Sequence, residues 1–490
     1  MTLKKPNILL IMVDQMRYDS LGCYGNECVK TPHLDSMADS GVVFDNHYVN
    51  SPFCTPTRSS LHTGKPLPGH GVYKLYDNLP LDEVLFPKRL KEIGYNTALV
   101  GKLHVSSRVT EEKGRHLNDG FDYYHWCHDP TTQLHSEFNA YSNWLQKNHP
   151  DFFRKLENRG KSLKNFPSTV HQTHWASTET INLIDQWPTE DPFFIEMSVF
   201  DPHNPYYDYP VEALELVDID SIDEHHNNYV DVHKEPAPIK RERNNSPLGP
   251  VCELTSEDLR EIRLGYYASV SFFDQEFGRL LEFLRGKGLE RDTLIIFTSD
   301  HGDMLGDHNL LGKGAFFYDP TTKVPLIIKW PGNLEMGRRV KKLTQPQDIT
   351  ATILGAAGYG CENTGQRIPE AFNLLEFSRG NKEKARQFAT CLYRNTGINK
   401  KGRYYDPPIF ATMIRDSRYK LNFYHDLSFS RKASGELFDL DRDPYETQNL
   451  WDEASLRKVK ENLISLLLDW EVSQELKRGS RGGENLPWSA

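Results

Sequence analysis

The chain lacks any apolar run long enough to cross a membrane. Its longest early run, residues 8–13, lies between Lys5 and Asp14 and is far shorter than the roughly 20 residues that a membrane-spanning helix needs. No small-residue cleavage site follows this run, so it does not resemble a secretory leader. We therefore interpret residues 8–13 as part of a buried strand and expect no membrane partner.

The chain is also poor in cysteine and has no excess of positive charge. Its seven cysteines form an odd, scattered set without the close-spaced pairs of zinc sites or disulfide frameworks. Reduced thiols of this kind favour a cytoplasmic location, unless a leader preceded residue 1. The net charge of −10 argues against a nucleic-acid partner, because nucleic-acid phosphates are bound mainly by clustered cations. An anionic substrate must then be held by a local group of cations.

What the chain does have is an alternation of apolar runs and helical patterns. With 38% hydrophobic and 26% charged residues, 490 residues suffice for one large core and a second, smaller one. Strands are expected at 7–13, 42–49, 97–100, 193–200, 293–298 and 324–329, and helices near 34–40, 81–93, 175–186 and 259–284. The alternation predicts an α/β fold in which helices flank a large, mainly parallel sheet.

The pattern changes from about residue 388. Short strands are expected at 388–393, 409–415, 419–424 and 436–440, followed by a helix near 454–470. They predict a smaller C-terminal α+β subdomain with an antiparallel sheet. We therefore expect a catalytic domain at residues 1–385 and this subdomain at 386–490. Residues 201–250, rich in proline, asparagine, histidine and charge, predict a long excursion over the surface.

The segment SPFCTPTRSSLHTG at residues 51–64 places Cys54 four residues before Arg58. Pro56 suits the first turn of a helix and Gly64 suits its end. Cys54 is then at a helix N-terminus, where unsatisfied amides and the helix dipole favour an anion. In isolation, a free cysteine is more often a small buried hydrophobe, and an arginine such as Arg58 is more often a solvated helix residue.

Polar residues also follow several predicted strands. Active sites of open α/β sheets gather at the carboxyl ends of strands. The residues at these ends are Asp14 and Gln15, Lys102 and His104, His203, and Asp300 and His301. Each has an ordinary alternative: a carboxylate that caps a helix, a surface lysine, or a histidine in a proline-fixed turn. Together they favour a shared site.

Three of these residues suit a divalent cation. Asp14 and Asp300 offer hard oxygens and His301 offers an imidazole, and the side chain at position 54 and a substrate oxygen would complete the shell. Lys102 and His104 are two residues apart on an extended segment, so they point the same way. Lys313 lies between two glycines that let the backbone approach a ligand, although a lone loop lysine is ordinarily just exposed.

Six ordered motifs between residues 6 and 475 resemble those of the type I, formylglycine-dependent sulfatases of the alkaline-phosphatase-like superfamily. They include CxPxR at 54–58, GKxH at 101–104, PHxP at 202–205 and Asp-His at 300–301. The resemblance implies that a formylglycine-generating enzyme converts Cys54 to formylglycine, whose hydrate attacks sulfur. It implies catalytic roles for Cys54, Arg58, Lys102, His104, His203 and Lys313, metal ligation by Asp14, Cys54, Asp300 and His301, and substrate binding by Lys102, His203 and Lys313.

Within that resemblance the cations neutralise the sulfate, His203 or Lys313 protonates the departing alcohol, and His104 takes a proton from the second hydroxyl. Calcium is the metal that the family implies. Many sulfatases have two aspartates at the first strand end, where this chain has Asp14 and Gln15. Gln15 could ligate through its amide oxygen or stay outside the shell. A shell with histidine and one fewer carboxylate leaves manganese and zinc open.

We expect a sulfuric ester hydrolase that acts on a sulfated carbohydrate or another small sulfate ester. Two alternatives remain: a phosphonate monoester or phosphodiester hydrolase with the same site, and a catalytically silent binder of sulfated ligands. Thr55 and Thr57 mildly favour sulfate, because the phosphonate group has small residues there. We expect residues 201–250 and a basic loop to select the substrate, and we leave a homo-oligomer open. The basic residues of that loop are Arg394, Lys400, Lys401 and Arg403. They could meet a carboxylate or a second sulfate, and they could equally be solvated surface charges.

Overall fold

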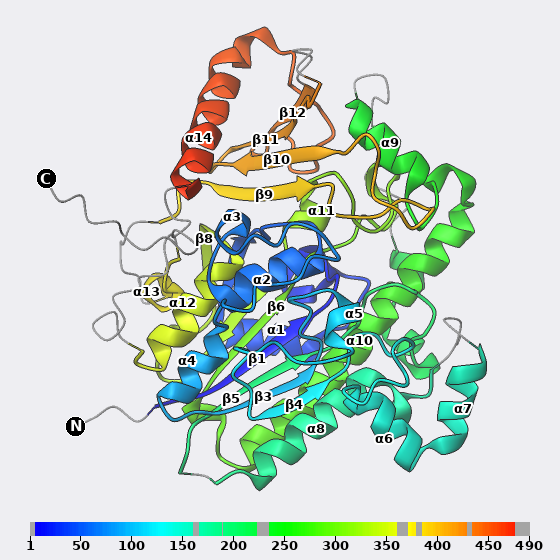
Figure 1. The fold of residues 1–490 in the computed structure, drawn as a ribbon, viewed down its shortest axis with the longest axis vertical. Helices are drawn as coiled ribbons and strands as arrows, with labels where there is room; N and C mark the ends of the chain where they lie inside the picture. The colour runs from blue at the N-terminus through cyan, green and yellow to red at the C-terminus, as the bar shows by residue number, and fades with distance from the viewer. Residues whose placement is uncertain are drawn as a thin grey trace, which may run out of the picture.

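Two sheets organise the protein. The computed structural model describes residues 5–159, 166–188, 190–222, 235–359, 371–378, 385–428 and 434–475. Within these ranges an eight-stranded sheet with helices on both faces lies beneath a four-stranded antiparallel sheet (Figure 1). The predicted fold class, a mainly parallel α/β sheet with a smaller antiparallel C-terminal sheet, is confirmed.

The large sheet has the strand order β4-β3-β5-β1-β6-β7-β2-β8. Only β7 runs antiparallel to its neighbours β6 and β2. The strands are β1 Asn7–Val13, β2 Val42–His47, β3 Asn96–Gly101, β4 Tyr123–Trp126, β5 Phe193–Ser198, β6 Thr293–Ser299, β7 Leu326–Lys329 and β8 Arg338–Thr344. The short, partly exposed β4 and the charged β8 form the two edges, and the apolar pattern predicted neither of them.

The central strand β1 is buried on both faces. Ile8, Leu10 and Met12 pack into one apolar cluster with residues of the helices α2 (Cys54–Thr63), α4 (Phe86–Glu92) and α12 (Pro346–Ala356). Leu9 and Ile11 point the other way, into a second cluster with residues of α1 (Pro32–Asp39), α8 (Gln172–Gln186) and α10 (Ser256–Gly286). Because side chains alternate along a strand, a continuous apolar run is what a strand between two helical layers requires.

The helices agree with the sequence pattern where they are long. They are α1 Pro32–Asp39, α2 Cys54–Thr63, α3 Leu67–His70, α4 Phe86–Glu92, α5 Arg108–Glu111, α6 Ala140–Asn148, α7 Pro150–Arg159, α8 Gln172–Gln186, α9 Ala237–Asn245, α10 Ser256–Gly286, α11 Asp319–Thr322, α12 Pro346–Ala356, α13 Leu374–Ser378 and α14 Arg457–Glu475. The expected helix at 81–93 shortens to α4, which begins beside Pro87, where proline is tolerated only in the first turn. No helix in the described ranges is long and apolar enough to span a bilayer.

The expected surface excursion at 201–250 contains short 3-10 turns and the helix α9. Residues 223–234 of this excursion lie outside the described ranges. The part that follows, residues 246–248, returns to the cavity at the strand ends. The excursion is therefore connected to the candidate site at its C-terminal end.

The C-terminal sheet has the order β12-β11-β10-β9, with β9 Ala389–Arg394, β10 Phe410–Arg415, β11 Tyr419–Tyr424 and β12 Ser434–Asp439. One face packs on α14. The other face contributes residues such as Cys391 and Met413 to an apolar cluster. The same cluster contains Phe53 and Phe317, which precede α2 and α11. The boundary at 385/386 stays a prediction, since this cluster joins the two parts.

A buried ion network also joins the two sheets. The Lys420 ammonium on β11 lies 2.8 Å from Asp319 Oδ1 and 2.8 Å from Glu446 Oε1. The Tyr48 hydroxyl donates to Asp319 as well. Lys420 is fully buried. The pKa of Glu446 is raised to about 7, because burial outweighs the opposing effect of Lys420. Lys420 therefore compensates two acids that would otherwise be costly to bury.

Lys420→Ala is expected to lower the free energy of unfolding by about 3–5 kcal/mol, because it leaves buried acids without their cation. Urea denaturation followed by tryptophan fluorescence measures this loss. Lys401→Ala, which removes an exposed lysine of the same part of the chain, is the matched control and should change little. Equal stability of the two variants would show that the network does not hold the sheets together.

Candidate active site

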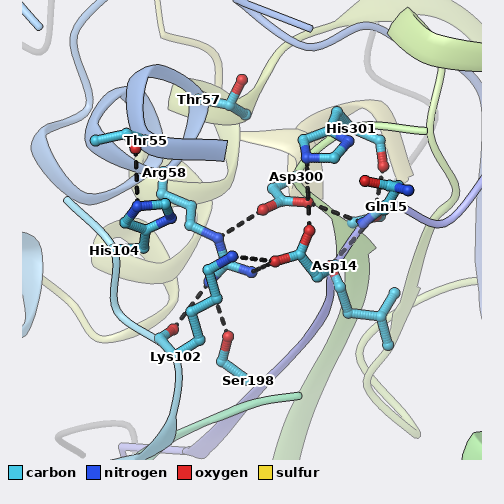
Figure 2. A network of polar contacts seen from close by, with 12 residues as sticks. Asp14, Gln15, Thr55, Thr57, Arg58, Lys102, His104, Ser198, Asp300 and His301 are labelled. Atoms are coloured by element: carbon cyan, nitrogen blue, oxygen red, sulfur yellow. Dashed lines mark hydrogen bonds and ion pairs between the residues drawn. The ribbon is translucent and has the colours of Figure 1, made fainter. Parts of the chain in front are cut away.

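Four adjacent parallel strands position the predicted site residues. The strands β3, β5, β1 and β6 are neighbours in the large sheet. Asp14 follows β1, Asp300 follows β6, Lys102 follows β3 and His203 comes shortly after β5. Because these strands run parallel, their carboxyl ends lie at one edge, and the side chains of Asp14, Lys102 and Asp300 converge there (Figure 2).

The helix α2 brings Cys54 to the same edge. Cys54 is its first residue, and Gly64 ends it in the left-handed region with φ 71°. The amide of Gly64 donates to the Ser60 carbonyl at 2.9 Å, which is the C-terminal arrangement that glycine favours. The predicted helix from Cys54 to Gly64 is thus confirmed. Cys54 is 3% exposed.

Two carboxylates and two cations form the buried centre of the site. Arg58 Nε donates to Asp300 Oδ2 at 2.6 Å, and its Nη2 lies 3.7 Å from Asp14 Oδ2. The Lys102 ammonium pairs with Asp14 Oδ2. All four side chains are 0–1% exposed. Arg58 is therefore not a solvated helix residue, and its planar fork fixes the two aspartates relative to α2.

The backbone around Lys102 is equally constrained. Arg58 Nη1 donates to the Lys102 carbonyl at 2.9 Å and to Ser198 Oγ at 2.8 Å. Gly101 has φ 107°, and a Cβ on it would lie 1.9 Å from the Ser198 carbonyl oxygen. Only glycine permits that close approach of β3 to β5. The glycine of the GKxH motif thus places the lysine.

Lys313 lies at the centre of a second group. Its ammonium is 2.8 Å from Gln15 Oε1, 2.9 Å from His203 Nε2 and 2.9 Å from His301 Nε2. Gln15, with φ 67°, also donates from its side-chain nitrogen to Asp303 Oδ2 at 2.5 Å. The Gln15 amide oxygen is therefore hydrogen-bonded to Lys313. The backbone of Gln15 adopts a sparsely populated conformation, which the surrounding contacts stabilise.

These charges shift the acidity of Cys54 and its neighbours. Burial disfavours the Cys54 thiolate, but Lys102, Lys313 and a hydrogen bond from His301 outweigh burial, so the pKa of Cys54 is lowered. Burial also works against the Asp14 carboxylate, yet Lys102 and other cations bring the pKa of Asp14 well below its usual value. Burial lowers the pKa of Lys102, but Asp14, Cys54 and Asp300 together outweigh burial, so the pKa of Lys102 is raised. The site thus favours negative charge at position 54.

His104 has one ring nitrogen left free. Its Nε2 is 3.0 Å from Thr55 Oγ1, and the Thr55 hydroxyl donates its single proton to the Leu75 carbonyl at 3.1 Å. The assignment that satisfies both contacts has His104 Nε2 as the donor. The buried Nδ1 of His104 has no hydrogen-bond partner in the described ranges. Burial and Lys102 lower the pKa of His104 well below its usual value, so the neutral ring offers an acceptor.

Glu111 holds the loop that carries His104. Its Oε2 accepts from the His104 amide at 3.0 Å and from the Trp126 indole at 3.0 Å. Its Oε1 accepts from the amides of Val105 and Ser106. His104 itself has φ 53°, in a region that costs energy for a residue other than glycine. Four donors on one buried carboxylate stabilise that conformation.

The donor set fits a divalent cation. Oδ1 of Asp14 is buried and has no hydrogen-bond partner among the described residues. Potential ligand atoms of Cys54, Asp300 and His301 lie within 4.8 Å of one another, and His301 Nε2 lies 3.5 Å from Asp14 Oδ1. Two carboxylates, one of them with an unpartnered oxygen, and an imidazole can hold a metal.

Several contributors to the site were not predicted from the sequence. Ser198 ends β5, so the strand-end rule could have found it. His128 lies two residues after β4, but β4 itself was not predicted. Glu111 and Asp303 contribute only by accepting hydrogen bonds from backbone amides or from other side chains of the site. No local sequence motif identifies a residue with such a role. The expected role of the basic loop is wrong for Arg394, which pairs with Glu471 at 2.9 Å and lines a different cavity.

Comparison with known proteins agrees with this geometry. The Sulfatase family model matches residues 6–359, and the family model "N-sulphoglucosamine sulphohydrolase, C-terminal" matches residues 306–473. The chain belongs to the sulfatase family. The family assignment made from the six motifs is confirmed, and this sulfatase is an enzyme of the alkaline-phosphatase-like fold.

The relatives extend over nearly the whole chain. An arylsulfatase of Clostridium perfringens is 27% identical and covers 95% of this sulfatase and 94% of the relative. An N-acetylglucosamine-6-O-sulfatase of Bacteroides thetaiotaomicron is 25% identical, with 95% and 86% covered. The solved phosphonate monoester hydrolase of Agrobacterium radiobacter is 26% identical, with a TM-score of 0.76 and 96% of both chains covered.

Glu111→Gln is expected to lower kcat of this sulfatase for an aryl sulfate by about 10- to 100-fold with little change in KM, since small misplacements of a catalytic group are costly. A glutamine keeps the size of the side chain but has one acceptor oxygen instead of two, so the 104–106 amides lose partners. Hydrogen exchange of those amides should therefore quicken in the folded variant.

Glu112→Gln is the matched control, because Glu112 is the next residue in the chain and is partly exposed. It should retain both the wild-type kcat and the slow exchange. If Glu111→Gln also retained both, Glu111 would not be what positions His104.

Proposed function

We propose that this sulfatase hydrolyses the sulfate ester of a carbohydrate or another small molecule, through formylglycine at position 54 and one divalent metal. The observation that carries the proposal is the environment of Cys54. Cys54 is the first residue of α2. Its side chain lines a cavity with Lys102, His104, His203 and Lys313, and the cations around it favour negative charge at this position. The Cys54 Sγ marks the place that the aldehyde oxygen would take, because conversion to formylglycine replaces the sulfur on Cβ with oxygen.

Asp14, Asp300, His301 and the side chain at position 54 would hold the metal. When bound there, a divalent cation supplies Lewis acidity to an oxygen of residue 54 and of the sulfate. We propose calcium, because carboxylate oxygens are the ligands that calcium prefers. Manganese and zinc remain alternatives on account of His301. Gln15 offers only a neutral amide oxygen, and we place it outside the shell.

The cations of the chain would bind the ester and stabilise the developing charge. Lys102 and Lys313 line the cavity beside residue 54, and Arg58 fixes the carboxylates behind it. Preorganised cations of this kind act without reorganising during the reaction, which is usually the largest electrostatic contribution to catalysis. Formylglycine hydrate supplies two hydroxyls on one carbon, so that one can attack sulfur and the other can later expel sulfate.

Two proton transfers follow from the hydrogen bonds. His203 Nδ1 contacts the Asn204 carbonyl at 2.8 Å, so this nitrogen is the donor and Nε2 accepts from Lys313. Burial and Lys313 lower the pKa of His203 well below its usual value. Lys313 is therefore the proton source, acting directly or through His203 Nε2, for the departing alcohol. His104, with its unpartnered Nδ1, takes the proton of the second hydroxyl.

The relatives support the substrate class. One is named an arylsulfatase and another an N-acetylglucosamine-6-O-sulfatase. The phosphonate monoester hydrolase that shares the fold and 26% of the sequence keeps a phosphonate monoester or phosphodiester hydrolase as the second candidate. A tetrahedral anion held by the same cations fits either reaction. Substrate comparison, rather than fold, has to separate them.

Several further properties belong to the proposal. A formylglycine-generating enzyme would act on the chain during maturation, with Cys54 and Arg58 within its recognition sequence. A cytoplasmic location, a homo-oligomer and a domain boundary at 385/386 stay predictions. They do not bear on the chemistry at position 54.

Coexpression with a formylglycine-generating enzyme is expected to convert Cys54 to the aldehyde, which peptide mass spectrometry detects. The converted enzyme should hydrolyse aryl and sugar sulfates with higher kcat/KM than phosphonate monoesters and phosphodiesters. Cys54→Ala should fold normally but have no turnover above background, because neither thiol nor aldehyde is present.

Two outcomes would contradict the proposal in different ways. Full activity with an unmodified Cys54 would exclude formylglycine as the nucleophile. A preference for phosphonate monoesters over every sulfate ester would retain the nucleophile but favour the second candidate.

A further inference from the structure

The cavity beside Cys54 contains a cation and an imidazole that the proposed mechanism does not use. The cavity has a volume of about 230 Å³, and Arg108 and His128 line it together with His104 and Lys102. That volume is small against the roughly 300–1,000 Å³ of pockets for drug-sized ligands. A ligand of about one sugar unit therefore brings its other substituents close to these two side chains.

His128 is buried without partners. It is 6% exposed, and neither of its ring nitrogens has a hydrogen-bond partner within the described ranges. Its ring packs edge-on against His104, with the centroids 4.2 Å apart. A buried polar side chain is normally hydrogen-bonded. One that is unpartnered and lines a cavity is free to bond a ligand there.

Arg108 is unpaired as well. It begins α5, is partly exposed, and its guanidinium has no hydrogen bond or ion pair with any part of the chain that the structure describes. The acid that lines the same cavity, Asp129, instead accepts from the amide and the hydroxyl of Thr131, both at 2.8 Å. Burial and His104 lower the pKa of His128 well below its usual value, and Arg108 adds to the effect.

The other cations of this cavity are already engaged. Lys102 pairs with Asp14, and Lys313 contacts Gln15, His203 and His301. The basic loop expected to choose the substrate does not take this place, because Lys400 is exposed and donates to the Asn244 carbonyl. From that loop, Ile398 lines the cavity. Since the proposed function assigns Lys102 and Lys313 to the ester that is cleaved, Arg108 is the cavity cation left, among the described residues, for a second group on the ligand.

We propose that Arg108 and His128 form a subsite for a second anionic group on the substrate, a carboxylate or a second sulfate on the same unit as the ester that is cleaved. This inference rests on the proposed function and narrows its substrate class. A guanidinium matches the two oxygens of either anion, and His128 adds a hydrogen bond from its ring N–H. Asp129 is itself an anion, and Phe200 and Leu248 are apolar, so none of these three lining residues would bind the second anionic group.

The test compares paired esters on the formylglycine-bearing enzyme. Glucuronic acid 2-sulfate is set against glucose 2-sulfate, and glucosamine 2-N,6-O-disulfate against N-acetylglucosamine 6-sulfate. In at least one pair, the doubly anionic ester should have the higher kcat/KM. Arg108→Ala should lower that preference by about tenfold or more, since a charge-assisted, two-pronged contact is lost. The pair of esters whose preference falls in Arg108→Ala shows whether the subsite binds a carboxylate or a second sulfate.

Conservative and control variants separate a binding role from a structural one. Arg108→Lys should restore part of the preference, and its effect should fall on KM more than on kcat. Lys113→Ala removes an exposed positive charge five residues away and should leave the preference at its wild-type value. A preference that survives Arg108→Ala, or that falls equally in Lys113→Ala, overturns the subsite.

A binding measurement tests the subsite even if the enzyme hydrolyses none of these esters. Calorimetry with Cys54→Ala protein measures the affinity for the same four compounds in the absence of turnover. The doubly anionic member should bind more tightly, and adding Arg108→Ala should abolish the difference. Equal affinities in the Cys54→Ala protein would overturn the subsite, whereas failure of hydrolysis alone would overturn the proposed function.

Discussion

The buried pairing of Asp14 and Asp300 with Arg58 and Lys102 is the interaction on which the rest of the site depends. Two carboxylates at the ends of adjacent strands could not remain charged inside the protein without compensation. Arg58 bridges them from α2, and Lys102 neutralises Asp14 from β3. The same pairing therefore fixes the start of α2, and with it Cys54, over the carboxyl ends of the sheet.

Backbone constraints complete this arrangement. Gly101 allows β3 to approach β5 closely enough for Lys102 to reach Asp14, and Glu111 holds His104 in a left-handed conformation. Gln15 is held in the same region by contacts with Asp303 and Lys313. Such conformations persist only where surrounding contacts over-determine them. The protein thus uses its buried polar contacts to position reactive groups and to leave Asp14 Oδ1, His104 Nδ1 and His128 available.

Sequence patterns predicted the parts of the fold that rest on apolar periodicity, such as β1, β6 and α10, and the strand-end residues of the site. They did not predict the edge strands β4 and β8, because a short or charged edge strand buries too few apolar residues to give a continuous apolar run. His128 was missed with β4. Glu111 and Arg108 were missed because their roles depend on which groups surround them in space. The expected role of Arg394 in substrate selection was wrong for the same reason. Its guanidinium pairs with Glu471, a partner 77 residues away in the sequence.

The central claim is that Asp14, Asp300, His301 and residue 54 surround one divalent cation. The most direct measurement is anomalous scattering from crystals of the formylglycine-bearing enzyme grown with manganese, which calcium should displace. We expect one peak within about 2.5 Å of a carboxylate oxygen of both aspartates, and none in crystals of Asp14→Ala. A peak at another place, or one that persists unchanged without Asp14, would contradict the claim.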